Sequence, residues 1–274
     1  MVLSELLASQ FNLPSIPRVV ALLLAELDRD EPDLKKVTQL VSTDPALTTL
    51  LLQISNSDDY KLAHTINSVS ESLAILGLKH VRAMAQKAAA GSSYKAVAGL
   101  NLQQFWGYSL NVAKVSRSLA GVVRQNQQAA FTCGLIHAVG ELAMYLAMGE
   151  KMSYISEDAP ALALKRADVE LRALTYCYAE VGAGFARQWQ FPQPIVDALE
   201  HQCRPFEKNV YEPLAGIIHL ATWRARAKEA GLDQRALAVT FPGAVGEIMK
   251  LDIDMVLQQD PIDWSQQAQG RTFA

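Results

Sequence analysis

Histidines are the residues of this chain that could support metal chemistry, and three of the five lie in stretches with the apolar spacing of buried helices. These three are His137, His201 and His219. Three converging imidazoles can bind a zinc ion, and a pair of metals bridged by carboxylates can activate water for phosphoester hydrolysis. Glu141 follows His137 by one helical turn, so the two side chains could share one face of a helix.

The carboxylates that such a centre needs are absent beside these histidines. In GLIHAVGEL, residues 134–142, the residue after His137 is Ala138. Glu200 precedes His201, but neighbouring residues on a helix point about 100° apart. The favoured interpretation is that each histidine is a core or boundary residue bonded to a backbone carbonyl. A retained metal ligand and a place in a ligand pocket are the alternatives.

Other catalytic motifs are missing from the sequence. There is no phosphate-binding loop of the GxxxxGK[ST] type, no GxSxG around a nucleophilic serine and no HExxH of a zinc protease. The GxG at 182–184 falls inside a helical pattern, where helix packing explains it better than nucleotide binding.

The composition predicts an all-α protein with a sizeable core. Of the 274 residues, 50% are hydrophobic, 19% are charged and only 7% are aromatic. The net charge of −3 argues against a polyanion-binding surface as the main function. The three cysteines form no CxxC pair, and no signal peptide or membrane span is evident, so we expect free thiols in a cytoplasmic protein.

Apolar residues recur at spacings of three and four along nearly the whole chain, which is typical of helices. A softer segment at 91–101 divides these helices into two groups. The periodicity predicts one long helix over 127–147 and another over 169–189, and it predicts that Gly77 ends a short helix before a second one begins.

Several blocks resemble the HDOD family, the HD-related output domains of bacterial signalling proteins. They lie in the family's order and cover most of residues 11–225: LPSIPRVV at 13–20, STDPALTTLLLQISNS at 42–57, INSVSESLAILGLKHVRAMA at 66–85, FWGYSLNVAKVSRSLA at 105–120, GLIHAVGEL, the stretch at 179–202, and IIHLATW at 217–223. The resemblance implies a multi-helix, HD-like bundle. Its N-terminal helical part would span about 11–95, its HD-like core about 100–225, and 226–274 would be a C-terminal helical extension and tail.

The family is related to HD-type metal phosphohydrolases, whose ligands are a histidine, a His-Asp pair and a late aspartate. At the matching positions this chain has Tyr108, then His137 with Ala138, then Thr222. The resemblance therefore implies a degenerate metal site with no metal and no cofactor. The candidate ligand-binding residues around it are Tyr108, His137, Glu141, Tyr178, His201 and His219.

Function is predicted from the same resemblance as a non-catalytic output module that acts on a regulatory protein partner or senses a small ligand, without a membrane. The polar loop that carries Asn56, Ser57, Asp58 and Tyr60 is a candidate recognition loop. One alternative is a metal-dependent phosphohydrolase acting on a nucleotide or phosphoester. Another alternative is nucleic-acid or cyclic-dinucleotide binding. The best basic patch for it consists of Lys79, His80, Arg82, Lys87 and Lys95. A solvated helix face explains that patch better.

Overall fold

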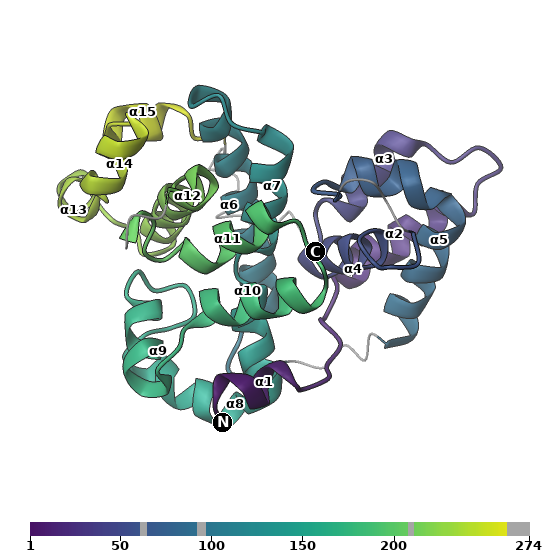
Figure 1. Cartoon of the computed structure of the whole chain (residues 1–274), viewed down its shortest axis with the longest axis horizontal. Helices are drawn as coiled ribbons and strands as arrows, with labels where there is room; N and C mark the ends of the chain where they lie inside the picture. Colours follow the sequence, from purple (N-terminus) through teal and green to yellow (C-terminus); the bar gives the residue numbers. More distant parts are fainter. Residues whose placement is uncertain (61–64, 92–96, 208–210, 262–274) are drawn as a thin grey trace.

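The computed structural model describes residues 1–60, 65–91, 97–207 and 211–261. Within these ranges all regular structure is helical and no β-strand occurs, which confirms the all-α prediction. The helices form two lobes joined through α4, as Figure 1 shows. Lys95 and the tail from 262 lie outside the described residues.

The N-terminal lobe is built from α2 (Pro17–Leu27), α3 (Leu34–Val41), α4 (Pro45–Ser55) and α5 (Val69–Gly91). Asp44 fixes the start of α4, because one of its carboxylate oxygens accepts hydrogen bonds from the amides of Ala46 and Leu47 at 2.8 and 3.0 Å. The other oxygen accepts from the Ile16 amide at 2.6 Å and so ties the entry of α2 to α4. Gly77 has a φ of 69° and kinks α5, as predicted.

The second lobe contains the helices that carry the predicted site: α6 (Leu102–Val122), α7 (Gln127–Ile136), α8 (Val139–Asp158), α9 (Arg166–Leu174), α10 (Tyr178–Gln188), α11 (Gln193–His201) and α12 (Pro213–Glu229). Helix α6 packs against α7 and α12, while α10 packs against α8 and α11. The short α1 (Leu3–Leu7) contacts α10, so the first residues of the chain belong in space to this lobe (Figure 1).

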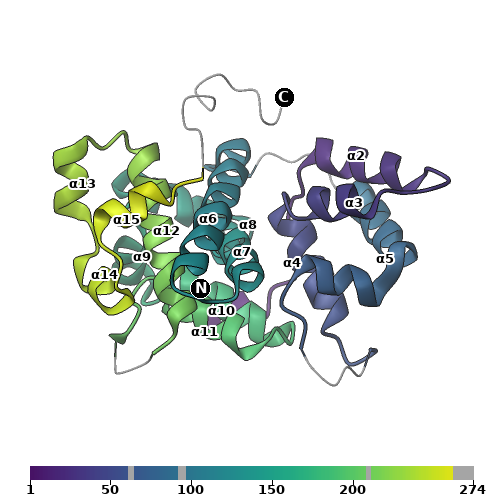
Figure 2. The same cartoon turned by 90° about the horizontal axis from the view of Figure 1, so that it is seen from above.

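Three short helices follow α12 and lie at the outer end of the second lobe (Figure 2). They are α13 (Gln234–Thr240), α14 (Gly243–Met249) and α15 (Ile253–Gln258), and both α14 and α15 contact α12. The division predicted between residues 225 and 226 falls inside α12. Helix α12 itself ends at Glu229.

Two predicted long helices are each broken in the structure. The helix predicted over 127–147 breaks at His137 and Ala138, where the imidazole bonds the Gly134 carbonyl that the Ala138 amide would use in a continuous helix. The helix predicted over 169–189 breaks at Thr175, whose left-handed conformation, with φ of 70°, ends α9. Apolar periodicity continues across both breaks because the flanking helices face one core.

The segment Gln127–Asp158 is apolar and long enough by composition to cross a membrane. Its most apolar window is 78% buried inside the protein, which is the property of a core helix. Gly140 allows this segment to approach α10 closely, because a Cβ there would lie under 3.0 Å from backbone atoms of Tyr178 and Gly182.

We predict that Gly140→Ala lowers the free energy of unfolding by about 1–3 kcal/mol or more, since rigid backbone must move to make room for the methyl group. Gly149→Ala in the same helix is the matched control, because a Cβ there meets nothing within 4 Å. Urea unfolding followed by circular dichroism measures both. Equal effects of the two substitutions would contradict the close packing of α8 on α10.

Candidate functional site

Tyr108 and His137 are hydrogen-bonded to each other in the core of the second lobe, where Tyr108 comes from α6 and His137 from the turn between α7 and α8. The imidazole Nδ1 lies 2.7 Å from the Gly134 carbonyl oxygen, which can only accept, so Nδ1 carries the proton. The Tyr108 hydroxyl lies 3.0 Å from Nε2 and donates to it. Burial lowers the pKa of His137 from its ordinary 6.5 to about 3. The ring is therefore neutral, and the lone pair on Nε2 already accepts the hydrogen bond from Tyr108.

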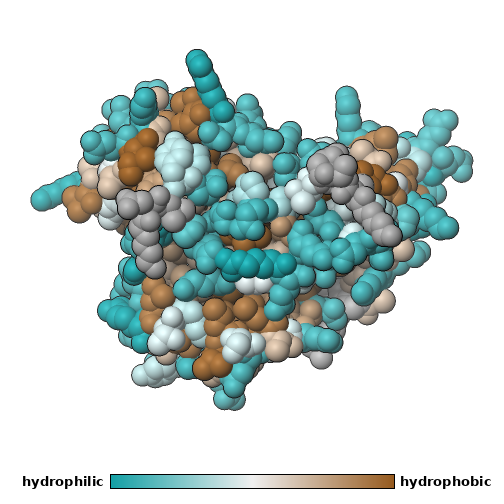
Figure 3. Space-filling model, in the orientation of Figure 1, coloured by the Kyte–Doolittle hydropathy of each residue, from teal (hydrophilic) through white to brown (hydrophobic). Residues whose placement is uncertain are grey.

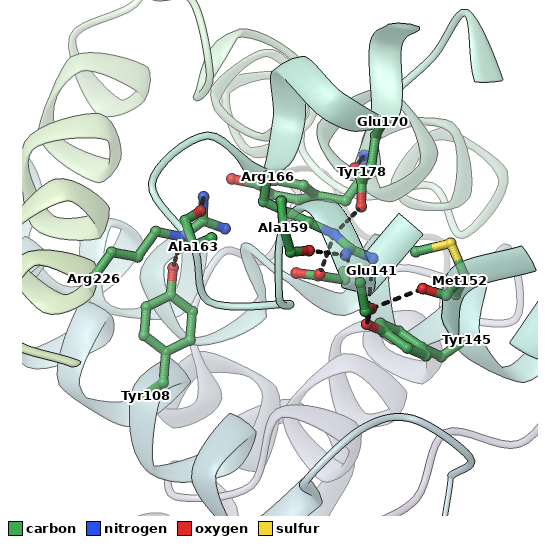
Figure 4. Close-up of polar contacts among 11 residues, drawn as sticks. Tyr108, Glu141, Tyr145, Met152, Ala159, Ala163, Arg166, Glu170, Tyr178 and Arg226 are labelled. Carbon is green, nitrogen blue, oxygen red and sulfur yellow. Dashed lines mark hydrogen bonds and ion pairs between the residues drawn. The ribbon is translucent and has the colours of Figure 1, made fainter. Parts of the chain in front are cut away.

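Arg226 is the second partner of Tyr108. It projects from α12 one turn after Thr222, and its Nε donates to the Tyr108 hydroxyl at 3.0 Å (Figure 4). Its Nη1 donates to the Ala163 carbonyl at 3.0 Å, and its guanidinium carbon lies 5.3 Å from the centre of the Tyr178 ring. The side chain is almost completely buried; burial lowers its pKa, but the electrostatic effects of Tyr108, Tyr178 and Glu141 raise that pKa well above the usual value. A permanent positive charge therefore occupies the interior of the lobe.

A second buried arginine organises the two carboxylates nearby. The Nε of Arg166 lies 3.0 Å from Glu141 and 2.8 Å from Glu170, and all three side chains have no exposed surface (Figure 4). Glu170 also accepts a hydrogen bond from the Tyr178 amide at 2.8 Å, which fixes the start of α10. Burial, and then the neighbouring Glu170, raise the pKa of Glu141, while Arg166 opposes this shift.

These contacts show that the residues present do not fit a two-metal centre. Nε2 of His137 accepts a hydrogen bond from Tyr108 and so cannot also bind a metal. Ala138 and Thr222 supply no carboxylate. Glu141 already forms an ion pair with Arg166 at 3.0 Å and also senses the charge of Arg226, and these two guanidinium groups would repel a divalent cation. Among the described residues, no group of three or more His, Cys, Asp or Glu side chains is placed to hold a metal ion.

The three histidines do not converge on one point. Gln202 connects two of them, because its side-chain amide donates to the His137 carbonyl at 3.0 Å and its own carbonyl accepts from Nδ1 of His219 at 2.8 Å. The predicted role as core histidines bonded to backbone carbonyls is thus confirmed for His137 and His219. His201 lies apart from this contact, half-buried at the end of α11.

The candidate recognition loop lies where the two lobes meet. Asn56 is used to close it: its amide group donates to the Ile66 carbonyl at 2.9 Å and accepts from the Ile66 amide at 2.8 Å. Asp58 is exposed and accepts from Gln190 of the second lobe at 3.2 Å. Ser57 donates to a carbonyl of α4, and the Tyr60 ring meets the His80 ring edge to face. Each of these four side chains therefore has a contact within the protein; residues 61–64 lie outside the described residues.

The predicted basic patch is partly neutralised by its own lobe. Arg82 forms an ion pair with Asp28 and also donates to the Leu27 carbonyl, while the His80 imidazole bonds the Leu76 carbonyl at 2.6 Å. The side chains of Arg82 and His80 thus already form contacts within the lobe. These contacts make nucleic-acid binding at the patch less favourable.

Arg166, Glu170 and Arg226 belong to the site and were not predicted from the sequence. Arg226 had a usable signal, because it follows Thr222 by four residues and so lies on the same helix face as the late ligand position. Arg166 and Glu170 had none, since the run KRADVE reads as a solvated helix start.

Comparisons with known proteins agree with this architecture. The family model described as HDOD domain matches residues 13–205. The MmoQ response regulator of Methylococcus capsulatus, a solved structure, is 22% identical with a TM-score of 0.73, over 92% of this chain and 98% of that one. A structure of its fragment is 25% identical with a TM-score of 0.70, over 89% and 94%.

Two further similarities have an equal or lower sequence identity. A virulence factor of Campylobacter jejuni is 18% identical with a TM-score of 0.70, over 94% of each chain. A protein of Treponema pallidum is 22% identical over 218 residues, which are 78% of this chain. The match covers 42% of that relative's length, so this chain corresponds to less than half of it.

We predict that Arg166→Met lowers the free energy of unfolding by about 3–5 kcal/mol, because it leaves Glu141 and Glu170 buried without their cation. Arg187→Met is the matched control: Arg187 pairs with Glu200 on the surface, where an ion pair contributes at most about 1 kcal/mol. Urea titration of both variants measures the difference. A loss for Arg166→Met no larger than the control would show that the buried network does not hold the lobe together.

Proposed function

The chain belongs to the HDOD domain family, and we propose that it is a non-catalytic regulatory module that acts through a protein partner or a small ligand. The observation that supports this proposal is the set of contacts made by the residues at the family's metal-ligand positions. The Tyr108 hydroxyl donates a hydrogen bond to Nε2 of His137, the nitrogen that could otherwise bind a metal. Arg226, which donates to the same hydroxyl, supplies the positive charge that a metal would bring. The interior of the second lobe is then a scaffold, and function belongs to the surface.

The family relationship supports a role in signalling. MmoQ is described as a response regulator, and its structure resembles this chain over nearly the full length of both. At 22–25% identity the likeness concerns the fold, so the signalling role of this chain is an inference by analogy.

The surface offers two kinds of contact area for a partner. The polar loop with Ser57, Asp58 and Tyr60 lies between the lobes, on a rigid support. Apolar side chains are exposed at the two ends of the second lobe, and Figure 3 shows hydrophobic surface over α1 and α8 and over the C-terminal helices. Exposed side chains of this kind include Val2, Tyr154, Val239 and Ile248.

We predict that the full chain, purified from cells supplied with Mn, Fe and Zn, contains far less than one equivalent of any of them, because Nε2 of His137 already accepts from Tyr108 and the guanidinium of Arg226 lies beside it. It should show no turnover of nucleotides or phosphodiesters. Elemental analysis and a substrate panel make the measurement, with an active metal phosphodiesterase carried through the same buffers as control. Stoichiometric metal, together with turnover that His137→Ala abolishes, would overturn the proposal and establish the phosphohydrolase alternative.

A further inference from the structure

The C-terminal helices α13, α14 and α15 form a small groove at the outer end of the second lobe (Figure 2). The groove has a volume of about 380 Å³, and its apolar lining comes from Phe241, Leu251 and Met255. Gly243 also lines it and is exposed, and a Cβ added there would meet nothing within 4 Å. The groove is therefore an apolar depression that opens to the protein surface.

The helices that form the groove are fastened to α12. The Trp223 indole donates to the Thr240 hydroxyl at 3.2 Å, and its ring meets the Phe241 ring edge to face. Just after α15, Asp260 forms a 3.0 Å ion pair with Arg224, and both side chains are largely buried. The walls of the groove are thus held in place, so a ligand that binds there loses less free energy to ordering of the protein.

The rim of the groove carries more negative than positive charge. Glu247 and Asp252 are exposed among its lining residues, and Lys250 is the one cation there. Glu247 and Lys250 form no ion pair with any side chain in the described ranges. Asp254 adds a further exposed carboxylate on α15. An apolar groove with an acidic rim is complementary to an apolar side chain that has a basic neighbour.

Further apolar side chains are exposed on the same helices. Val239 of α13 is 79% exposed and Ile248 of α14 is 47% exposed, and Figure 3 shows hydrophobic surface over this end of the lobe. These helices also lie beyond residues 13–205, the part that matches the family model. Exposed apolar area beside a groove is typical of a surface that contacts another molecule.

We propose that this groove binds a short linear segment of a partner protein, with one bulky apolar side chain in the groove and a neighbouring lysine or arginine against the rim. The volume is near the lower end of the range of about 300–1,000 Å³ that is usual for ligand sites, which suits one or two side chains. The acidic rim would repel the phosphates of a nucleotide. The site rests on the regulatory function proposed above and specifies the class of partner.

Selection from a random peptide library displayed on phage, with the folded full chain as the target, tests the proposal. We expect the enriched sequences to place a large aliphatic or aromatic residue next to lysine or arginine. One enriched peptide is then synthesised with a fluorescent label, and its affinity for wild type and variants is measured by fluorescence anisotropy. Circular dichroism checks that each variant is folded.

Gly243→Leu tests the groove itself. The new side chain should occupy the groove without a clash and weaken binding of the peptide by about tenfold or more, because it excludes the apolar side chain of the peptide. Gly149→Leu is the matched control and should leave the affinity unchanged. A Cβ at Gly149 also meets nothing within 4 Å, and α8 does not line the groove.

Glu247→Lys tests the acidic rim. Reversal of this exposed charge should weaken binding of the same peptide by about two- to tenfold at low salt and by less at high salt, because salt screens surface charges. Glu157→Lys makes the same change of net charge on the exposed surface of α8 and should have no comparable effect.

Any of three results would refute the docking site. The first is that no peptide is enriched, and the second is that the enriched peptides are acidic or bind Gly243→Leu as tightly as wild type. The third is a wild-type dimer in sedimentation experiments that Gly243→Leu dissociates, since the groove would then be an interface between two copies. Metal content and turnover decide the regulatory proposal separately, so a metal-free, inactive chain without a peptide ligand would contradict the groove alone.

Discussion

The burial of Arg226 is the constraint on which the rest of the second lobe depends. A guanidinium group cannot lose its charge in a protein, and a buried charge is costly unless the surroundings compensate it. No ion pair reaches Arg226 among the described residues, so the compensation comes from the Tyr108 hydroxyl, the Ala163 carbonyl and the faces of two tyrosine rings. Glu141 and Glu170 act from farther away, through the ion pair that they share with Arg166.

The same arrangement ties His137, which the family resemblance marks as a metal ligand, into a hydrogen-bond chain across three parts of the second lobe. His137 keeps the tautomer that suits a ligand, with Nδ1 bonded to a backbone carbonyl, but Nε2 accepts from Tyr108. Arg226 then hydrogen-bonds the other side of the same hydroxyl. One directed chain, from guanidinium to phenol to imidazole to carbonyl, thus links α12, α6 and the turn before α8.

Much of the fold could be predicted from the sequence, because apolar spacing and caps such as Asp44 are local signals. The family resemblance also marks Ala138 and Thr222 as positions of metal carboxylates, and the loss of the metal site there stays a prediction. The replacement network could not be predicted. Arg166 and Glu170 look like surface charges in a helix start, and only the packing of α8, α9 and α10 buries them. The helix breaks at His137 and Thr175 could not be predicted for a different reason. Each depends on one local hydrogen bond or backbone conformation, which apolar periodicity does not report.

The state of His137 is the most direct test of this view of the site. Nitrogen-15 NMR of the full chain, with the ring assigned by comparison with His137→Gln, reports the protonation and ligation of each ring nitrogen. We expect a neutral ring protonated at Nδ1, unchanged by added Zn²⁺ and by acidification until well below its ordinary pKa of 6.5, since burial lowers that pKa to about 3. A zinc-induced shift of Nε2, or protonation of the ring near pH 6.5, would contradict the claim that Tyr108 and Arg226 have replaced the metal.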